Sequence, residues 1–491
     1  MEYRYLEPER IREEAAYWRF PGVAAAVFTE DHEESFCTGL RAVDGKEPFD
    51  GDTMFTIASC SKSFTSMLAA QLADEGLLDW DAPVSSYLPE FQMWDAAATE
   101  KMSLRDILCH RTGFGAHDVI WPAPYSRAEM AETLRFIEPT DAYASPRTLY
   151  SNVMYAMAGY VEEAVSGKSW DDLLREKIFT PLGMSRSDGS GKVLVGDPNH
   201  AEPHYYDKGE IVRVPYWNVD QAGPAASVTS TLRDLTKWVR CHANGGTAPD
   251  GTRIVSPERF ALLHTAHVPH VFGPRIPHPG YHPGGYCLGW QIGTYRGAVY
   301  QRHGGKIEGY SSLMAYLPEK RAGFVILVNL HCPPDYFFQG MFYRLADRLL
   351  NLPGDEAAYF PKEGEHAPDS FYHECELDIA ARRLDPALQG TPGRFLPEEL
   401  TGVYENRGYG RVTVRLEGGQ LFLHYRDQEL PLQPFGGDSY VLEGVLADVL
   451  TMRVPVRFES HIPTGRAERV FIGYEAGVRD ILFMHRRENR G

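Results

Sequence analysis

The sequence predicts an α+β fold, in which an antiparallel sheet is flanked by helices and joined to a helical lobe, and a small antiparallel β-barrel follows. Three observations support this class. Strand patterns bracket a helical middle between residues 1 and 351. A stretch rich in Pro, Gly and acidic residues at 352–396 is typical of a linker. Short alternating strands with Gly turns then occupy 397–491.

The elements of the larger domain, 1–351, follow in order from local patterns. A polar helix at 8–18 precedes two apolar strands at 22–29 and 35–40. The next helix opens near Ser59, and Gly76 is placed to end it. Further helices are indicated at 103–110, 152–165, 170–179 and 231–246. The closing elements are strands at 286–295, 298–302, 311–317 and 323–329, and a helix at 335–352.

The smaller domain, 397–491, shows strand patterns only. Alternation of apolar and polar residues, interrupted by Gly turns, is the usual signature of a small barrel or sandwich. The expected strands lie at 402–406, 411–425, 439–444, 454–460, 469–476 and 480–486.

The composition and charge of the chain exclude some classes of protein. The chain has 43% apolar and 24% charged residues, as globular proteins do. Acidic residues outnumber basic ones 67 to 49, and the formal charge of −18 argues against a nucleic-acid partner. The longest apolar stretch, 323–330, is far shorter than a bilayer span. We expect no membrane association and no secretory signal, and hence a cytoplasmic protein whose seven cysteines are free thiols.

The strongest local motif is Ser59-x-x-Lys62 at the start of a helix. Residues three apart share a helix face, so the lysine amine can reach the serine hydroxyl. The pair alone is weak evidence for a catalytic site, because an N-capping serine beside a solvated lysine has the same spacing. The apolar surroundings strengthen it, since a buried lysine must find a polar partner or lose its proton. Ser59 is therefore a candidate nucleophile and Lys62 its base.

Two further motifs are individually ambiguous. Tyr150 and Asn152 stand at the opening of another helix. A tyrosine whose pKa is lowered by a neighbouring lysine can transfer protons, although a buried tyrosine before a capped helix gives the same pattern. In the third motif, 302–306, two glycines would let a strand approach a ligand closely, and His303 could orient a leaving group. Taken alone, this segment is more often a glycine turn.

The three motifs, in this order and spacing, resemble those of the serine β-lactamase and penicillin-binding-protein family: Ser-x-x-Lys, Tyr-x-Asn and Lys/His-x-Gly on an edge strand. The segments 108–114, 223–228 and 288–290 are similar to secondary marks of the same family, and the resemblance covers about residues 8–350. It implies the fold of that family for the larger domain. The smaller domain is similar to the lipocalin-like barrel of some family peptidases.

The resemblance also implies a role for each motif residue. Ser59 would be acylated, Lys62 would activate it, and Tyr150 would relay protons to the leaving group and to the deacylating water. Asn152 would hold the substrate amide and Lys62, and His303 would complete the hydrogen-bond network. The oxyanion hole would consist of the backbone N–H groups of Ser59 and Lys306 beside Gly305, each worth about 3 kcal/mol. Arg302 and Lys306 could bind an anionic substrate group.

One departure bears on the substrate. Position 303 is His, where true β-lactamases usually carry Lys to hold the β-lactam carboxylate. His is more similar to the esterases, D-amino-acid peptidases and amidases of the family. We therefore predict a serine hydrolase for a small ester, amide or short peptide, needing no cofactor and able to form homo-oligomers. The alternatives are a weak β-lactamase and a non-catalytic member that binds peptides or scaffolds a partner.

Other chemistries find little support. Five histidines crowd a Pro- and Gly-rich segment, 264–282, but no Asp, Glu or Cys stands at a ligand spacing, so we expect no metal site. We interpret the segment as a loop over the cleft whose imidazoles contact substrate or solvent. A phosphate-binding loop is excluded, because Glu162 occupies the glycine position upstream of 167–169. The Gly-x-Ser-x-Gly elbow is also absent.

Overall fold

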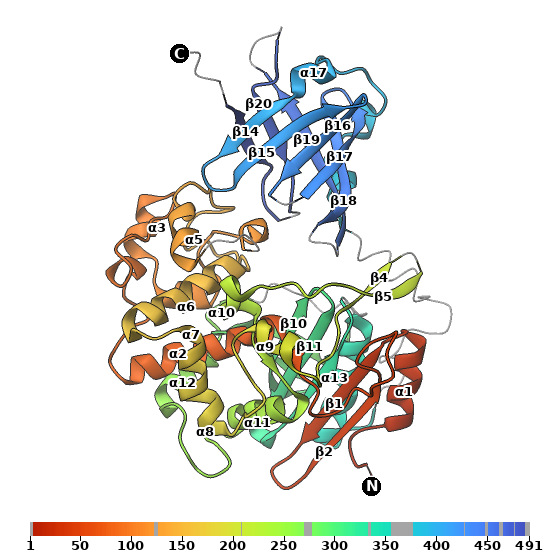
Figure 1. Ribbon diagram of the computed structural model, residues 1–491. Coiled ribbons are helices and arrows are strands. Elements are labelled where there is room, and N and C mark those ends of the chain that lie inside the picture. Colours follow the sequence, from red (N-terminus) through yellow and green to blue (C-terminus); the bar gives the residue numbers. More distant parts are fainter. Residues whose placement is uncertain are drawn as a thin grey trace.

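The computed structural model describes residues 3–121, 126–207, 209–269, 277–331, 335–354, 377–426, 428–446, 450–460, 465–475 and 477–486. It confirms the expected fold class: an antiparallel sheet with helices on both faces, a helical lobe, and a β-barrel that lies beyond the lobe (Figure 1). No helix in these ranges has the length and apolarity needed to cross a bilayer.

The central sheet has eight antiparallel strands in the order β2-β1-β12-β11-β10-β9-β8-β7. Strand β1 pairs with β12, so strands from the two ends of the larger domain lie side by side in one sheet. This pairing explains why strand patterns stand on either side of a helical middle. The strands are β1 Gly22–Phe28, β2 Glu33–Gly39, β7 Val268–Pro269, β8 Tyr281–Tyr286, β9 Gln291–Tyr295, β10 Ala298–Ile307, β11 Tyr310–Leu317 and β12 Ala322–Val328.

Two layers of helices bury the sheet. Helices α1 (Pro8–Tyr17) and α13 (Asp335–Leu350) cover one face, where the odd-numbered positions of β1 lie in a common apolar core with α13. A buried ion pair between Arg344 and Glu14, at 2.6 Å, joins the two helices. Helices α2 (Lys62–Asp74) and α11 (Leu232–Ala243) lie on the other face, with the even-numbered positions of β1. The functional residues are on this second face.

The helical lobe is built from short capped helices. Ser103, Ser126, Ser151 and Ser169 each accept a backbone N–H of the helix that follows, and Gly167 ends α6 with a left-handed φ of 68°. The lobe and its neighbours comprise α3 Ala96–Lys101, α4 Leu104–Leu108, α5 Arg127–Leu134, α6 Asn152–Ser166, α7 Trp170–Leu174, α8 Thr180–Leu182, α9 Gly191–Gly196, α10 Gly223–Ala226 and α12 Pro257–Leu263. Two small two-stranded antiparallel sheets, β3 Phe55–Thr56 with β6 Thr229–Ser230 and β4 His204–Asp207 with β5 Glu210–Arg213, complete this region.

Two details differ from the sequence-based expectation. The single strand expected at 286–295 is two strands, β8 and β9, that meet at Gly289. Gly289 has a φ of 75°, and a Cβ there would lie 2.7 Å from the Lys62 carbonyl oxygen, so the turn requires glycine. The third motif lies inside β10 and does not follow it, because β10 extends to Ile307 along its partner β11.

The C-terminal domain is an eight-stranded antiparallel barrel. From β14 to β21, each strand pairs with the next one in the sequence. Strand β14 also pairs with β21, and this pairing closes the ring. Its interior is filled by apolar side chains such as Val414, Leu423 and Phe458. The strands are β14 Gly402–Asn406, β15 Gly410–Glu417, β16 Gln420–Tyr425, β17 Gln428–Gly436, β18 Ser439–Leu446, β19 Leu450–Glu459, β20 Arg469–Ile472 and β21 Ile481–His485.

The sheet of the barrel includes one strand from the stretch expected to be a linker, 352–396. Strand β13 (Leu377–Asp378) runs parallel to β19, and helix α16 (Ile379–Arg383) follows it. Residues 355–376 of that linker lie outside the described residues. Helix α17 (Pro397–Leu400) leads into β14. The sequence pattern missed β17, because Pro431 and Pro434 interrupt it.

Candidate active site

Ser59 and Lys62 lie where the chain passes from β3 into α2. A 3-10 turn, η1 (Ala58–Ser61), carries Ser59, and Lys62 is the first residue of α2. Ala58 has a left-handed φ of 50°, an unfavourable conformation for a residue with a Cβ, directly before the serine. Ser59 remains partly accessible, whereas Lys62 is fully buried.

The Lys62 amine has three hydrogen-bonding neighbours. Its Nζ lies 2.6 Å from Asn152 Oδ1, 3.0 Å from the Ala225 carbonyl oxygen and 3.2 Å from Ser59 Oγ. The amide and carbonyl oxygens can only accept, so each takes an N–H from the amine. In the neutral amine two N–H groups are used in this way, and the lone pair is left facing the Ser59 hydroxyl. This is the arrangement of a base about to take the serine proton.

The surroundings make that neutral form accessible. Burial lowers the pKa of Lys62 to about 7, because desolvation disfavours the ammonium, and the negative charge of Asp118 acts in the opposite sense. A base with a pKa near the working pH combines a useful unprotonated fraction with useful basicity.

Tyr150 and Asn152 enter the site from the start of α6. Ser151 caps the helix by accepting the Met154 N–H, and the residues on either side of it contact Lys62 and Ser59. The Lys62 Nζ lies 4.6 Å from the centroid of the Tyr150 ring, and the Tyr150 hydroxyl is hydrogen bonded to Ser59. The expected lowering of the Tyr150 pKa is wrong: desolvation raises the pKa well above its ordinary value, and the bond to Ser59 only partly opposes it. Tyr150 is a neutral phenol here, suited to relay a proton through its hydroxyl.

Replacing Tyr150 with Phe is expected to lower turnover by about 10²–10⁴-fold, because the proton relay between Ser59 and the leaving group loses its hydroxyl. Tyr155→Phe is the matched control, since its hydroxyl bonds the Leu108 carbonyl oxygen at 2.6 Å and not Ser59. Steady-state rates of both variants, with melting temperatures, separate the two effects. Near wild-type turnover in the Tyr150 variant would refute the relay.

His303 completes the site from β10 with both ring nitrogens engaged. Its Nδ1 donates to the Gly304 carbonyl oxygen at 2.7 Å, and its Nε2 lies 3.0 Å from the Tyr286 hydroxyl. Because a carbonyl only accepts, Nδ1 carries a proton, and the neutral ring accepts at Nε2 from Tyr286. The His110 ring packs against Tyr150 and Tyr286, with centroid distances of 4.2 and 4.8 Å. These aromatic rings form one wall of the site.

Arg302 does not take part in this site, contrary to the sequence-based expectation. Successive residues of a strand point to opposite faces, so Arg302 projects away from His303. Its Nη1 donates to Gln339 Oε1 at 3.1 Å, and its guanidinium lies 5.2 Å from the centroid of the Phe342 ring on α13. The same alternation places the exposed side chain of Lys306 on the Arg302 face. Its backbone N–H stays a predicted oxyanion donor, together with that of Ser59.

Gly305 lets β10 approach the nucleophile. Strand β9 pairs with β10 only along Ala298–Arg302, and beyond it β10 lies against η1, where Cys60 Sγ is 3.3 Å from the His303 carbonyl oxygen. A Cβ on Gly305 would lie 2.1 Å from the Ile57 carbonyl oxygen, whereas one on Gly304 would have the Ser312 carbonyl oxygen at 3.6 Å as its neighbour. The distance between His303 and Ser59 thus depends on glycine at 305.

Gly305→Ala is therefore expected to move β10 away from η1, at a cost of about 1–3 kcal/mol in unfolding free energy and at least about 10-fold in turnover. Gly304→Ala, one residue away, should leave both close to wild type. Thermal unfolding and turnover of the pair test this. Equal effects at the two positions would contradict the close-approach argument.

Sequence reasoning missed three contributors. Asp118 accepts from Asn152 Nδ2 at 3.0 Å, and the Ala225 carbonyl oxygen accepts from Lys62. Tyr286 bonds His303. The segment 223–228 had been noted without a role, and a backbone carbonyl carries no side-chain signal. Asp118 and Tyr286 stand in stretches without a motif, and only the fold brings them to the site.

The histidine-rich segment does not behave as one loop over the cleft. His264 faces the core, 3.0 Å from both His242 Nδ1 and the Tyr316 hydroxyl, and burial lowers its pKa to about 3. His278 packs against Tyr295 and Tyr343. Both imidazoles therefore pack against aromatic side chains while remaining partly exposed, His282 is exposed as expected, and His270 lies outside the described residues. Across the described ranges, no three His, Cys, Asp or Glu side chains gather as a metal would require.

The fold and the site together are those of a serine hydrolase family in which a serine and a lysine lie side by side. Comparison with known families then places it: the chain belongs to the Beta-lactamase family, whose model matches residues 10–347. A second model, described as a domain of unknown function (DUF3471), matches residues 395–485 and so corresponds to the barrel.

Relatives agree with this placement. The chain is 25% identical to unguisins hydrolase ungD of Aspergillus violaceofuscus, over 95% of this chain and 87% of the relative. It is 27% identical to penicillin-binding protein 4 of Amycolatopsis lactamdurans, over 70% of this chain and 89% of the relative.

Solved structures share the fold. An octameric penicillin-binding protein homologue from Pyrococcus abyssi superposes with a TM-score of 0.60 and 20% identity, over 97% of this chain and 98% of the other. A D-amino acid amidase from Ochrobactrum anthropi gives a TM-score of 0.57 and 22% identity, over 70% of this chain and 96% of the other. The first likeness extends over both domains, and the second is confined to a smaller part of the chain.

Proposed function

We propose that the protein acylates Ser59 and cleaves a small ester, amide or short peptide, in the manner of a D-amino-acid peptidase, amidase or esterase. One observation carries the proposal: the buried Lys62 amine lies 3.2 Å from Ser59 Oγ while two acceptors hold its other hydrogen-bonding directions. A lysine held in this way serves as a general base for the serine.

The site supports a two-step reaction. Ser59 Oγ attacks the substrate carbonyl as its proton passes to Lys62, and the oxyanion is stabilised by the backbone N–H groups of Ser59 and Lys306. The proton then moves through the Tyr150 hydroxyl to the leaving alcohol or amine, which departs and leaves an acyl-Ser59 ester. In the second step water attacks this ester, gives its proton to the same relay, and releases the acid and Ser59.

Two observations favour amides and peptides over β-lactams. One relative is named as an unguisins hydrolase, and a structural neighbour is named as a D-amino acid amidase, which supports a small amide as substrate. At the position where lysine would hold a β-lactam carboxylate, His303 has its ring nitrogens engaged with Gly304 and Tyr286. In this tautomer it presents no cationic group.

The test is a panel of p-nitrophenyl esters, D- and L-aminoacyl anilides and nitrocefin, run on wild type and on Ser59→Ala. We expect hydrolysis of an ester or D-aminoacyl anilide that depends on Ser59, and little turnover of nitrocefin. Faster turnover of nitrocefin than of any other compound would favour the weak β-lactamase. Failure of a fluorophosphonate to label folded wild-type protein would favour the non-catalytic alternative.

A further inference from the structure

The barrel reaches the catalytic domain through the loop between β20 and β21. Glu475, in that loop, accepts the backbone N–H of Val119 at Oε1 with a distance of 3.0 Å. The backbone N–H groups of Asp118 and His117 also interact with this carboxyl group. Three successive N–H groups at the start of the η3 turn (Asp118–Ile120) therefore converge on one side chain from the other domain.

This turn carries the residue that orients Asn152. A side-chain amide can be rotated so that either its oxygen or its nitrogen faces a given neighbour. Asp118 Oδ1 accepts from Asn152 Nδ2 at 3.0 Å, which leaves Asn152 Oδ1 facing Lys62 Nζ at 2.6 Å. Displacement of Asp118 would free the amide, and with it one of the two acceptors that direct the Lys62 lone pair at Ser59.

The charge of Asp118 affects the ionisation of Glu475. Burial and the neighbouring charge of Asp118 raise the pKa of Glu475 to about 8, and burial raises the pKa of Asp118. Glu475 Oε2 is buried and has no hydrogen-bonding partner. Burial and the charge of Asp118 both favour the neutral form of Glu475, which accepts at Oε1 without repelling Asp118.

The loop is held from within the C-terminal domain. Arg383, at the end of α16, donates to the carbonyl oxygens of Glu475 and Val478 at 2.6 and 2.5 Å, and to Asp480 at 2.5 Å. These bonds fix the backbone on both sides of the turn that presents Glu475. The side chain thus has a defined position before it meets the catalytic domain.

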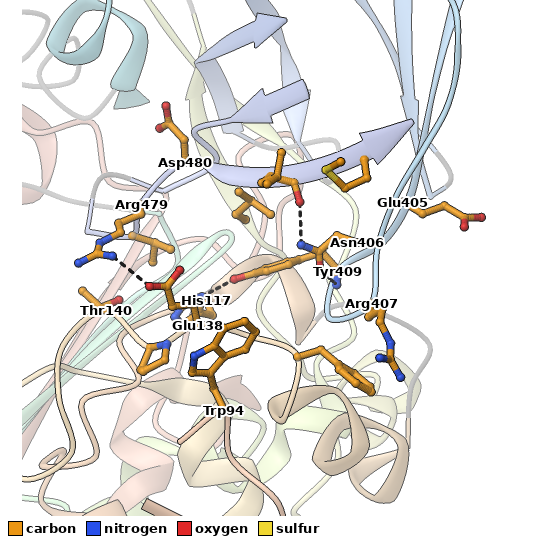
Figure 2. Close-up of a pocket in the computed structure, with 16 residues that line it drawn as sticks. Trp94, His117, Glu138, Thr140, Glu405, Asn406, Arg407, Tyr409, Arg479 and Asp480 are labelled. Atoms are coloured by element: carbon orange, nitrogen blue, oxygen red, sulfur yellow. Dashed lines mark hydrogen bonds and ion pairs between the residues drawn. The ribbon is translucent and has the colours of Figure 1, made fainter. Parts of the chain in front are cut away.

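The same contact borders a pocket of about 430 Å³ between the lobe and the barrel (Figure 2). Among the residues that line it, Figure 2 shows His117 hydrogen bonded to Tyr409 and Arg479 paired with Glu138. The Arg479–Glu138 pair, at 3.1 Å, joins two exposed side chains and does not touch the 117–119 turn. It offers a control for loosening of the interface alone.

We propose that Glu475 is a positioning residue for the catalytic lysine: it holds the 117–119 turn so that Asp118 fixes the Asn152 amide against Lys62. The barrel is then part of the working active site. The inference rests on the proposed serine hydrolase function, since it assigns a role within that same site.

The experiment compares full-length wild type, Glu475→Ala and Glu475→Gln by the concentration dependence of fluorophosphonate labelling of Ser59. In the alanine variant we expect the maximal labelling rate to fall at least about 10-fold while the half-saturating concentration changes less than about 3-fold, because the change misplaces the base without touching the probe. The glutamine variant should recover the rate to within about 3-fold, since its amide oxygen still accepts the Val119 N–H and it is neutral as Glu475 is.

Two further variants complete the design. Arg479→Ala breaks the ion pair at the interface and should label at the wild-type rate. Arg383→Ala loosens the Glu475 loop from within the C-terminal domain and should slow labelling, which covers the case that Glu475→Ala does not fold.

The outcomes separate the two proposals. Wild type labelled at Ser59, with Glu475→Ala or Arg383→Ala equally fast, overturns the positioning role and leaves the hydrolase proposal intact. Equal losses in Arg479→Ala and Glu475→Ala also overturn it, since loosening of the interface then suffices. Failure of the wild type to label overturns both.

Discussion

Ser59→Ala is expected to abolish the acyl-enzyme and lower turnover by at least about 10⁴-fold, since in the described part of the chain Ser59 carries the one hydroxyl that is hydrogen bonded to the Lys62 amine. Methyl in place of hydroxymethyl leaves a small gap at a partly accessible position, so the fold should survive. Intact-mass analysis after treatment with a fluorophosphonate or a slow p-nitrophenyl ester measures the adduct directly. Peptide mapping of the wild type should place it on Ser59.

Ser63→Ala is the matched control for this result. Ser63 lies one turn further along α2, where its hydroxyl donates to the Cys60 carbonyl oxygen at 2.7 Å and accepts from Trp238 Nε1 at 3.1 Å. Its loss should cost about 1 kcal/mol in stability and leave labelling in place. An adduct that persists in Ser59→Ala would mean that the nucleophile has been misassigned.

Lys62→Met is expected to lower the acylation rate by about 10²–10⁴-fold and to change its pH dependence. In the wild type the reactive form is the neutral amine. Lys62 has a pKa of about 7 and therefore gains a proton as the pH falls. The third N–H of the ammonium then donates to Ser59, so no lone pair is left to accept the serine proton and the rate drops. The wild-type rate should therefore rise with pH through about 7 and level off above it, and Lys62→Met should lack this inflection.

Stopped-flow release of p-nitrophenolate between about pH 5 and pH 9 measures this profile, with an inflection expected near the pKa of the base. Lys168→Met, which removes an exposed lysine paired with Glu176, should reproduce the wild-type curve. A Lys62→Met profile with the same acid limb as wild type would assign the limb to another group.

The larger domain shows which features of the fold can be predicted from local sequence. The Ser59–Lys62 pair, the capped start of α6 and the strands on either side of a helical middle all follow from periodicity and capping within a few residues. In the barrel, local patterns were not sufficient. Strand β17 was not predicted, because Pro431 and Pro434 interrupt its alternation, and only its pairing with β16 and β18 reveals it.

The site separates the two kinds of information. Ser59 and Lys62 could be predicted as nucleophile and base from local sequence, because residues three apart share one face of a helix. Local sequence could not predict that Arg302 faces α13, that His264 bonds His242, or that Asp118 and Glu475 stand behind Asn152. These depend on strand register, burial and the contact between domains, which arise from residues far apart in the chain. The basicity of Lys62 belongs to the same group, because desolvation by the whole fold sets its pKa.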